Sequence, residues 1–251
     1  MKPHKVKGWL NPKCSAEELS AGSKRICEVY KEAPDKWEKE GIKTISTDEK
    51  TGMQALERNA PDLKMGVGQT RKREYEYTRH GTLCLIANWD VSEGKIIYPT
   101  IGETRKEEDF LAHIEQTVQN DPTVKGWRFV TDNLNTHQSE SLVKWVASLE
   151  GMSVKQLGEK GKKGILKSME TRSEFLRNPN HFVHFIYTPK HCSWLNQVEI
   201  WFGILARKVI NKGNFTSKED LKEKVIKFID YFNLVLAKPF KWTYDGKPCT
   251  E

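Results

Sequence analysis

Three carboxylates occupy positions from which they could act together. Asp48 ends a short β-branched segment, Asp132 closes the apolar run WRFVTD, and Glu199 lies within an apolar helical stretch. Ligands of open α/β sheets gather beyond the carboxyl ends of strands, so Asp48 and Asp132 converge if their strands are neighbours. Carboxylates without histidine or cysteine suit Mg²⁺ or Mn²⁺, and two such ions about 3.5–4 Å apart can act on a phosphate ester.

Each carboxylate also has a structural interpretation when it is taken alone. An Asp that follows a strand is commonly a turn former or a helix cap. A Glu on a helix commonly faces water, and beside an apolar stripe it is costly unless a positive group pairs with it. Spacing by itself leaves both interpretations open, so the surrounding elements and sequence motifs are needed to distinguish them.

Hydrophobic patterning predicts the strands and helices that would position these residues. A hairpin is expected around the turn DVSEG, and the strand WRFVTD lies between two helical segments. The order predicts a mixed sheet flanked by helices, an α/β fold with an antiparallel edge. The expected strands are residues 42–48, 80–89, 95–99, 127–132 and 181–189.

Helix signals accompany these strands. A helix over residues 15–34 would end at Pro34, and Thr104 with Glu107, Ser139, and Thr216 with Glu219 would cap three later helices. A helix that opens at Ser193 carries an apolar stripe with helical spacing, which predicts a core-facing surface. The stripe consists of Val198, Trp201, Phe202, Leu205 and Val209.

Charge is the first compositional clue to a partner. The 251-residue chain has 41 Lys and Arg against 34 Asp and Glu, a net charge of +7 that favours polyanions such as nucleic acid. Its five scattered cysteines form no CxxC pair, and no apolar run approaches the length of a membrane span. Positive charge clusters in two runs, Arg71, Lys72 and Arg73, and Lys160, Lys162, Lys163 and Lys167, although a solvated loop without a ligand would look similar.

Two short sequence motifs bear on the function of these carboxylates. TDNLNTH, residues 131–137, and YTPKHCSWLNQVEIWF, residues 187–202, resemble the second and third acidic motifs of DDE transposases of the mariner-type superfamily, in its bacterial insertion-sequence branch. STDEKTGMQALER, residues 46–58, resembles the opening motif, and the likeness runs from about residue 15 to Trp242. The resemblance implies an RNase H-like mixed five-stranded sheet flanked by helices.

The same resemblance implies roles for individual residues. Asp48, Asp132 and Glu199 would be the catalytic, metal-binding triad for two Mg²⁺ or Mn²⁺ ions. Asn133, Asn135, His137 and His191 would either orient the metal ligands or contact DNA, whereas Trp194 and Asn196 could equally serve packing. The two basic runs would grip phosphates without reading bases. His80, His113 and His184 lie within predicted elements, and we assign them no function.

The resemblance also predicts the organisation of the chain. Residues 1–40 are expected to be the remnant of a helix-turn-helix region with a linker helix, and residues 41–235 the catalytic domain. A basic insertion at about 152–180 lengthens the stretch before Glu199, and residues 236–251 form a tail. We expect the chain to be the catalytic half of a split reading frame or a fragment, with a separate chain supplying the helix-turn-helix reader.

The implied activity is metal-dependent cleavage and strand transfer of an insertion sequence. The partners would be double-stranded DNA, as transposon ends and target, and a second copy of the chain in a homodimer on DNA. The expected location is the cytoplasm, at the nucleoid, without membrane attachment. Two alternatives stand: an RNase H-like nuclease without strand transfer, and a transposase-derived DNA-binding protein that no longer catalyses.

Overall fold

The computed structural model describes residues 15–246, which contain one mixed sheet of five strands in the order β3-β2-β1-β4-β5. This confirms the predicted mixed five-stranded sheet flanked by helices. The chain divides into two compact units, which we describe separately. The described residues of the first unit are 15–44, 124–196 and 241–246, and the second unit comprises 45–123 and 197–240. The residues of the expected helix-turn-helix remnant before Ser15 lie outside the described part.

The first unit begins with the helix α1 (Ala16–Glu40), which is longer than predicted. Its start follows the capping-box pattern, because Ser15 Oγ accepts the Glu18 N–H and the Glu18 carboxylate accepts the Ser15 N–H. The prediction that the helix ends at Pro34 is wrong, since Pro34 lies inside it. The helix ends instead where Gly41 takes the left-handed conformation, with φ 70°, and its N–H bonds back to the last turn.

Two parallel strands form the sheet of the first unit, β4 (Gly126–Thr131) and β5 (Val183–Tyr187). Both are buried throughout, as a strand covered on two faces must be. Arg128 points to α1 and donates to Val29 O and Thr44 Oγ1. The alternate positions carry a stacked aromatic row, namely Trp127, Phe129, Phe185 and Tyr187. The two predicted strands are confirmed: β4 is shifted by one residue from 127–132, and β5 is shorter at both ends than 181–189.

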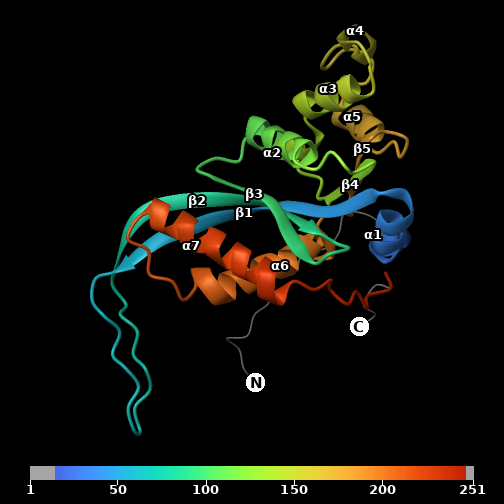
Figure 1. Ribbon diagram of the computed structural model, residues 1–251. Helices are drawn as coiled ribbons and strands as arrows, with labels where there is room; N and C mark the ends of the chain where they lie inside the picture. Colours follow the sequence, from blue (N-terminus) through green and yellow to red (C-terminus); the bar gives the residue numbers. More distant parts are fainter. Residues whose placement is uncertain (1–14, 247–251) are drawn as a thin grey trace. The chain divides into compact units, whose positions relative to one another are not determined.

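Short helices surround these strands in the first unit (Figure 1). Ser139 caps α3 as predicted, because its Oγ accepts the Leu142 N–H at 3.2 Å. The basic segment from 152 to 180 contains two of the helices and is tied down where Arg172 Nε donates to Gln138 O at 2.7 Å. These helices are η1 (Asn135–Gln138), α3 (Glu140–Leu149), α4 (Val154–Leu157), α5 (Met169–Leu176) and η2 (Ser193–Leu195).

The antiparallel strands are β1 (Ile42–Arg58), which belongs to the second unit from Ile45 onward, and β2 (Tyr77–Asp90) and β3 (Lys95–Gly102), which lie wholly within it. Asp48 does not end the first strand as predicted, since it lies mid-strand opposite Ala87. The strand continues because an irregularity after Lys50, with Gly52 at φ 68°, is absorbed before pairing resumes at Met53.

The predicted hairpin between β2 and β3 is confirmed. Asp90 Oδ1 accepts the N–H groups of Ser92 and Glu93, and the turn closes at Gly94 with φ 69°. A side chain at Gly94 would collide with the Lys238 backbone, since a Cβ there would lie 2.0 Å from its carbonyl carbon. Glycine is therefore required at this turn both for its conformation and for its close packing.

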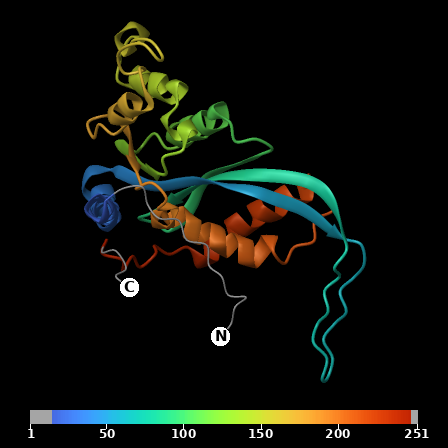
Figure 2. The same cartoon turned by 180° about the vertical axis from the view of Figure 1, so that it is seen from behind.

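Helices cover both faces of these three strands, with α6 and α7 on one face and α2 on the other (Figures 1 and 2). Neighbouring β2 residues fix this arrangement, because Asn88 Nδ2 donates to Thr117 Oγ1 of α2 and Trp89 Nε1 donates to Gln197 Oε1 of α6. The helical segments are α2 (Glu107–Gln119), α6 (Gln197–Leu205), η3 (Ala206–Ile210), α7 (Lys218–Tyr231) and η4 (Phe232–Leu236).

The starts of three helices differ from the predictions. The segment from Ser193 opens as the 3₁₀ turn η2, and α6 begins only at Gln197, so Val209 falls beyond the buried stripe. Before α2, the predicted pairing of Thr104 with Glu107 does not form. Thr104 Oγ1 instead donates to Asp109 Oδ2 at 2.6 Å. The Asp109 carboxylate also accepts the Lys106 N–H, so it is this residue that marks the start of α2.

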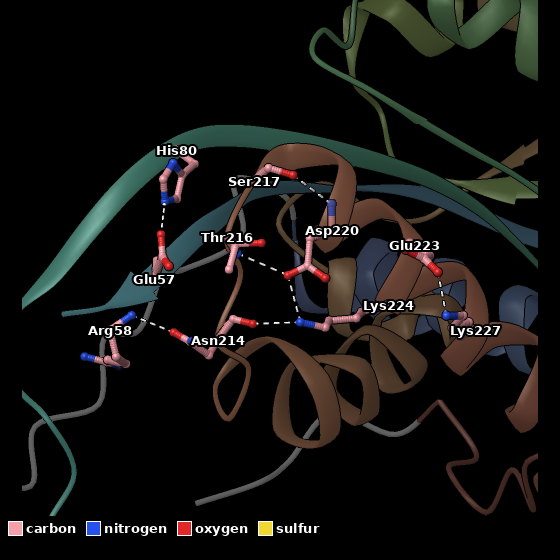
Figure 3. A network of polar contacts seen from close by, with 10 residues as sticks. All are labelled: Glu57, Arg58, His80, Asn214, Thr216, Ser217, Asp220, Glu223, Lys224 and Lys227. Carbon is pink, nitrogen blue, oxygen red and sulfur yellow. Dashed lines mark hydrogen bonds and ion pairs between the residues drawn. The ribbon is translucent and has the colours of Figure 1, made fainter. Parts of the chain in front are cut away.

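At α7 the cap is Ser217, one residue later than predicted. Ser217 Oγ accepts the Asp220 N–H at 3.1 Å, and the Asp220 carboxylate accepts the Thr216 N–H (Figure 3). Lys224 bonds the same carboxylate and the Asn214 carbonyl, which joins the helix to the preceding loop. Asp220 therefore takes the part in the cap that the sequence pattern gave to Glu219.

Two further features of the described residues bear on the predictions. Cys27, Cys84 and Cys192 are buried and are not joined in disulfides. None of the helices within residues 15–246 is both long and apolar enough to cross a bilayer.

Candidate active site

Asp48 stands on the central part of β1, where the residues before it are completely buried. The Asp48 side chain is itself mostly buried, with 7% of the residue exposed, and its Oδ1 accepts the Glu49 N–H at 2.8 Å. On β2, burial raises the pKa of the Cys84 thiol to about 11, and the negative charges of Glu49 and Asp48 act in the same direction. Acidic side chains of β1 thus lie in a largely buried environment.

A buried hydrogen bond fixes the start of α6 against the same strand. The Val198 N–H donates to Ser46 Oγ at 2.9 Å, and both residues are fully buried. Ser46 and Asp48 lie on one face of β1, because side chains alternate along a strand. Glu199 directly follows Val198 and is exposed. The bond therefore brings together the backbones that carry the Asp48 and Glu199 carboxylates.

Asp132 lies in the first unit, immediately after β4. Its Oδ1 accepts the Leu134 N–H at 3.0 Å and lies 2.8 Å from His137 Nδ1. His137 is fully buried, and its carbonyl accepts the Tyr187 hydroxyl at 2.8 Å. Burial raises the pKa of Tyr187, so this phenol remains a donor. The imidazole is thus held at a fixed point beside the Asp132 carboxylate.

A cavity of about 380 Å³ opens beside Asp132 within the first unit. Asn133 lines it and donates to the Thr188 carbonyl, which joins the ends of β4 and β5. His191 also lines it and holds a left-handed backbone, with φ 63°, which is uncommon for a residue other than glycine. The first unit therefore gathers Asp132, Asn133 and His191 around one opening.

Other residues of the two motifs lie apart from this opening or serve packing. Asn135 begins η1 and is exposed, whereas Asn196 is fully buried. Trp194 is 51% exposed and meets Tyr244 edge-on, with 5.0 Å between ring centroids. Trp194 therefore keeps an open face, which a core residue would not.

The first basic run is partly engaged within the protein. Arg71 pairs with Asp62, and a backbone hydrogen bond from Glu74 together with Arg71 lowers the pKa of that carboxyl. Arg73 donates to the carbonyls of Asn211 and Gly213. Lys72 is exposed on the ribbon formed by residues 59–76, where isolated bridges join Leu63 to Lys72 and Gly66 to Gln69.

The second basic run remains open to solvent. Lys160 pairs with Glu140 at 3.3 Å and Lys162 with Glu159 at 3.0 Å, and both lysines stay well exposed. Lys163 and Lys167 are exposed as well. Exposed ion pairs of this kind stabilise little, so a polyanion could displace them at small cost.

Asp48 and Glu199 belong to the second unit and Asp132 to the first, and each is described within its own unit. Across residues 15–246, the structure shows no group of three or more His, Cys, Asp or Glu side chains arranged to hold a metal ion. Metal binding by the triad therefore stays a prediction, as do the proposed DNA contacts.

Sequence reasoning missed Ser46, which ties β1 to α6. Alternation could have placed Ser46 and Asp48 on one face, but nothing local reveals a hydrogen bond to a residue 152 positions away. Arg25, Arg177 and Lys190, which line a second cavity in the first unit, also gave no signal, because they lie outside both basic runs.

The sheet order and its flanking helices correspond to an RNase H-like fold. The chain resembles the crystal structure of the catalytic domain of Mos1 mariner transposase with a TM-score of 0.50 and 11% identity, covering 88% of this chain and 85% of that one. At this identity the likeness shows the fold. The sequence matches the DDE superfamily endonuclease family over residues 43–222, and the chain belongs to that family.

Longer relatives share the fold too. The Mos1 mariner paired-end complex with Mn matches with a TM-score of 0.52 and 14% identity over 90% of this chain, and the Mos1 strand transfer complex with 0.51 and 13% over 90%. The chain spans 59% and 58% of those two proteins. No curated protein sequence matches the chain significantly.

Proposed function

We propose that the chain is the catalytic domain of an insertion-sequence transposase, of the bacterial branch of the mariner-type superfamily, which cleaves DNA and transfers the cut strand to target DNA. The family membership over residues 43–222 supports the reaction class. The observation that carries the proposal is the buried hydrogen bond between Ser46 and Val198, because it ties the Asp48 strand to the Glu199 helix.

The chemistry of the donor set fits divalent metal. Asp48, Asp132 and Glu199 offer only oxygen donors, which Mg²⁺ and Mn²⁺ prefer, and these residues would hold two ions. Bound ions of this kind act as Lewis acids, which lower the pKa of water and stabilise a leaving phosphate-ester oxygen. The Mos1 paired-end complex with Mn supports the same expectation for this chain.

The chain's own residues position the reacting groups. His137 lies 2.8 Å from the Asp132 carboxylate and would restrain its orientation, in the way that outer groups orient metal ligands. Asn133 and His191 line the opening beside Asp132 and would contact DNA there. The exposed lysines at 160, 162, 163 and 167, with Arg71, Lys72 and Arg73, would bind phosphates. Positioning and charge neutralisation require no covalent nucleophile.

The proposed partner is double-stranded DNA, as transposon ends and as target. The similar Mos1 structures include a complex with the left transposon end, which supports this choice. A homodimer on DNA would supply two catalytic domains for two ends, and a separate helix-turn-helix chain would read the terminal sequence. The place of action would be the cytoplasm, at the nucleoid.

The test is nicking of an end-containing duplex in Mg²⁺ by the Asp132→Asn variant, with Asp230→Asn as the matched control on the exposed face of α7. Nicking by Asp132→Asn should fall to background while duplex affinity stays within about twofold, because phosphate contacts dominate affinity. Asp230→Asn should nick normally. Full nicking by Asp132→Asn would refute its assignment as a metal ligand.

Two additions to this assay separate the alternatives. With target DNA present, a joined product supports a transposase, whereas nicking without joining favours a nuclease. Calorimetric titration with Mn²⁺ should give two ions per wild-type chain and fewer for Asp48→Ala. Absence of metal binding and of nicking in the wild type would favour a DNA-binding protein without catalysis.

A further inference from the structure

A second cavity of the first unit has a positively charged lining. It measures about 560 Å³, and its wall includes Arg25 from α1, Arg177 from the end of α5 and Lys190 after β5. Its single acidic residue is Glu18, whose carboxylate is already engaged by the Ser15 N–H in the α1 cap. The lining therefore carries three cations against one carboxylate, an excess of positive charge.

The charges of Arg25 and Arg177 act on each other across this lining. Within residues 15–246, no ion pair joins Arg25, Arg177 or Lys190 to a carboxylate. Desolvation lowers the pKa of Arg177, and the positive charge of Arg25 lowers it further. Two guanidinium groups held together in this way repel one another, and an anion between them would relieve that repulsion.

The fold fixes the positions of both arginines. Gly22 lets α1 approach the chain after β5 closely, because a Cβ there would lie 2.8 Å from Pro189 Cγ. Arg25 follows one turn later on the same face of the helix. Arg177 packs over the Tyr187 ring, with its guanidinium carbon 5.2 Å from the ring centroid. The cavity is therefore prearranged by packing.

The cavity adjoins the opening beside Asp132. Asn133, Thr188, Pro189 and Lys190 line both cavities, so a chain of phosphates could pass from one to the other. We propose that Arg25, Arg177 and Lys190 form a phosphate-binding pocket, which holds a non-scissile backbone phosphate of the DNA strand bound at Asp132. This inference rests on the proposed function of the Asp132 site.

The ligand chemistry follows from the side chains. The planar guanidinium fork donates paired hydrogen bonds to phosphate oxygens, and Lys190 adds a point charge. The volume lies within the range of about 300–1,000 Å³ for small-molecule sites, which leaves room for the sugar attached to the phosphate. Contacts of this kind position a strand without reading its sequence.

The test measures duplex DNA binding by fluorescence anisotropy over a range of salt concentrations, in Ca²⁺ and without a cleavage readout. The double variant Arg25→Gln with Arg177→Gln should bind about tenfold more weakly. Its plot of log affinity against log salt should be shallower by about one, as expected for one lost phosphate contact. Lys31→Gln, an exposed change elsewhere on α1 and away from the cavity, is the matched control and should leave the slope unchanged.

The single variant Arg177→Lys keeps the charge but loses the guanidinium fork, so its salt slope should stay that of the wild type while its affinity falls less than that of the double variant. Calorimetry with inorganic phosphate distinguishes a DNA phosphate from free phosphate as the ligand. If the double variant loses binding of inorganic phosphate but keeps the wild-type salt slope for DNA, the assignment to DNA is overturned. Unchanged DNA binding by the double variant also overturns it.

Nicking is assayed separately on the wild type. Wild-type nicking with an unchanged slope in the double variant would refute the pocket and leave the proposed function standing. A shallower salt slope in the double variant, without nicking by the wild type, would support the pocket and refute the proposed function, since the pocket would bind DNA that the chain does not cut.

Discussion

Replacing Ser46 with alanine should destabilise the second unit and loosen the helix that carries Glu199. In the structure Ser46 Oγ accepts the Val198 N–H at 2.9 Å, and both residues are fully buried. Alanine removes the acceptor and leaves the Val198 N–H in the first turn of α6 without this partner. Water cannot replace it, because the site is closed to solvent.

The size of the effect follows from the buried donor. An unsatisfied buried N–H costs about 1–3 kcal/mol, so we expect a loss of about 2 kcal/mol. For a chain of roughly 150–250 residues this lowers Tm by about 4–8 °C. If Glu199 acts as proposed, nicking should also fall by about 10–100-fold, as for losses of residues that orient metal ligands.

Urea and thermal denaturation of the wild type and Ser46→Ala measure the stability change. Ser148→Ala is the control, because Ser148 is exposed and its hydroxyl donates only within its own helix, to Trp145 O. Its Tm should change by less than about 2 °C. Equal Tm values for Ser46→Ala and Ser148→Ala would refute the reasoning that this bond anchors α6.

Two further predictions concern stability. Burial lowers the pKa of His113 to about 3. Below about pH 6.5 the unfolded chain therefore binds a proton at His113 that the folded chain does not bind. The free energy of unfolding is unaffected by His113 above that pH and should fall by about 2 kcal/mol by pH 5. Urea unfolding at both pH values should show a smaller loss for His113→Gln, and an equal loss would contradict the assignment. Gly22→Ala should cost about 1–3 kcal/mol because its Cβ would lie 2.8 Å from Pro189 Cγ, whereas Gly102→Ala enters open space. Thermal denaturation compares them, and matching Tm values would contradict close packing at Gly22.

Local patterns predicted those elements whose signals lie within a few residues. The strand Gly126–Thr131 is apolar throughout, and the helix after Ser139 has both a cap and an apolar face, so each was found close to its observed bounds. The hairpin after Asp90 has the polar turn residues that such a turn requires. In these cases the interactions that form the element join near neighbours along the chain.

Features that depend on distant partners were not predicted. α1 continues through Pro34 to Gly41, and β1 continues beyond Asp48 because β2 pairs with it on both sides of the irregularity after Lys50. The basic run predicted that Arg71 binds phosphate, and nothing local indicated that Arg71 pairs with Asp62. Pairing across a sheet supplies hydrogen bonds that a local pattern does not contain.

The amino-acid sequence alone determined the residue types of the candidate site, the charge of the chain and its likeness to an enzyme family, because these are properties of composition and local order. Only the tertiary structure decided that Ser46 holds α6, that His137 lies against Asp132, and that three unpaired cations share a cavity. The physical reason is that burial and hydrogen-bond geometry arise where separate segments meet, so they have no counterpart in the linear pattern.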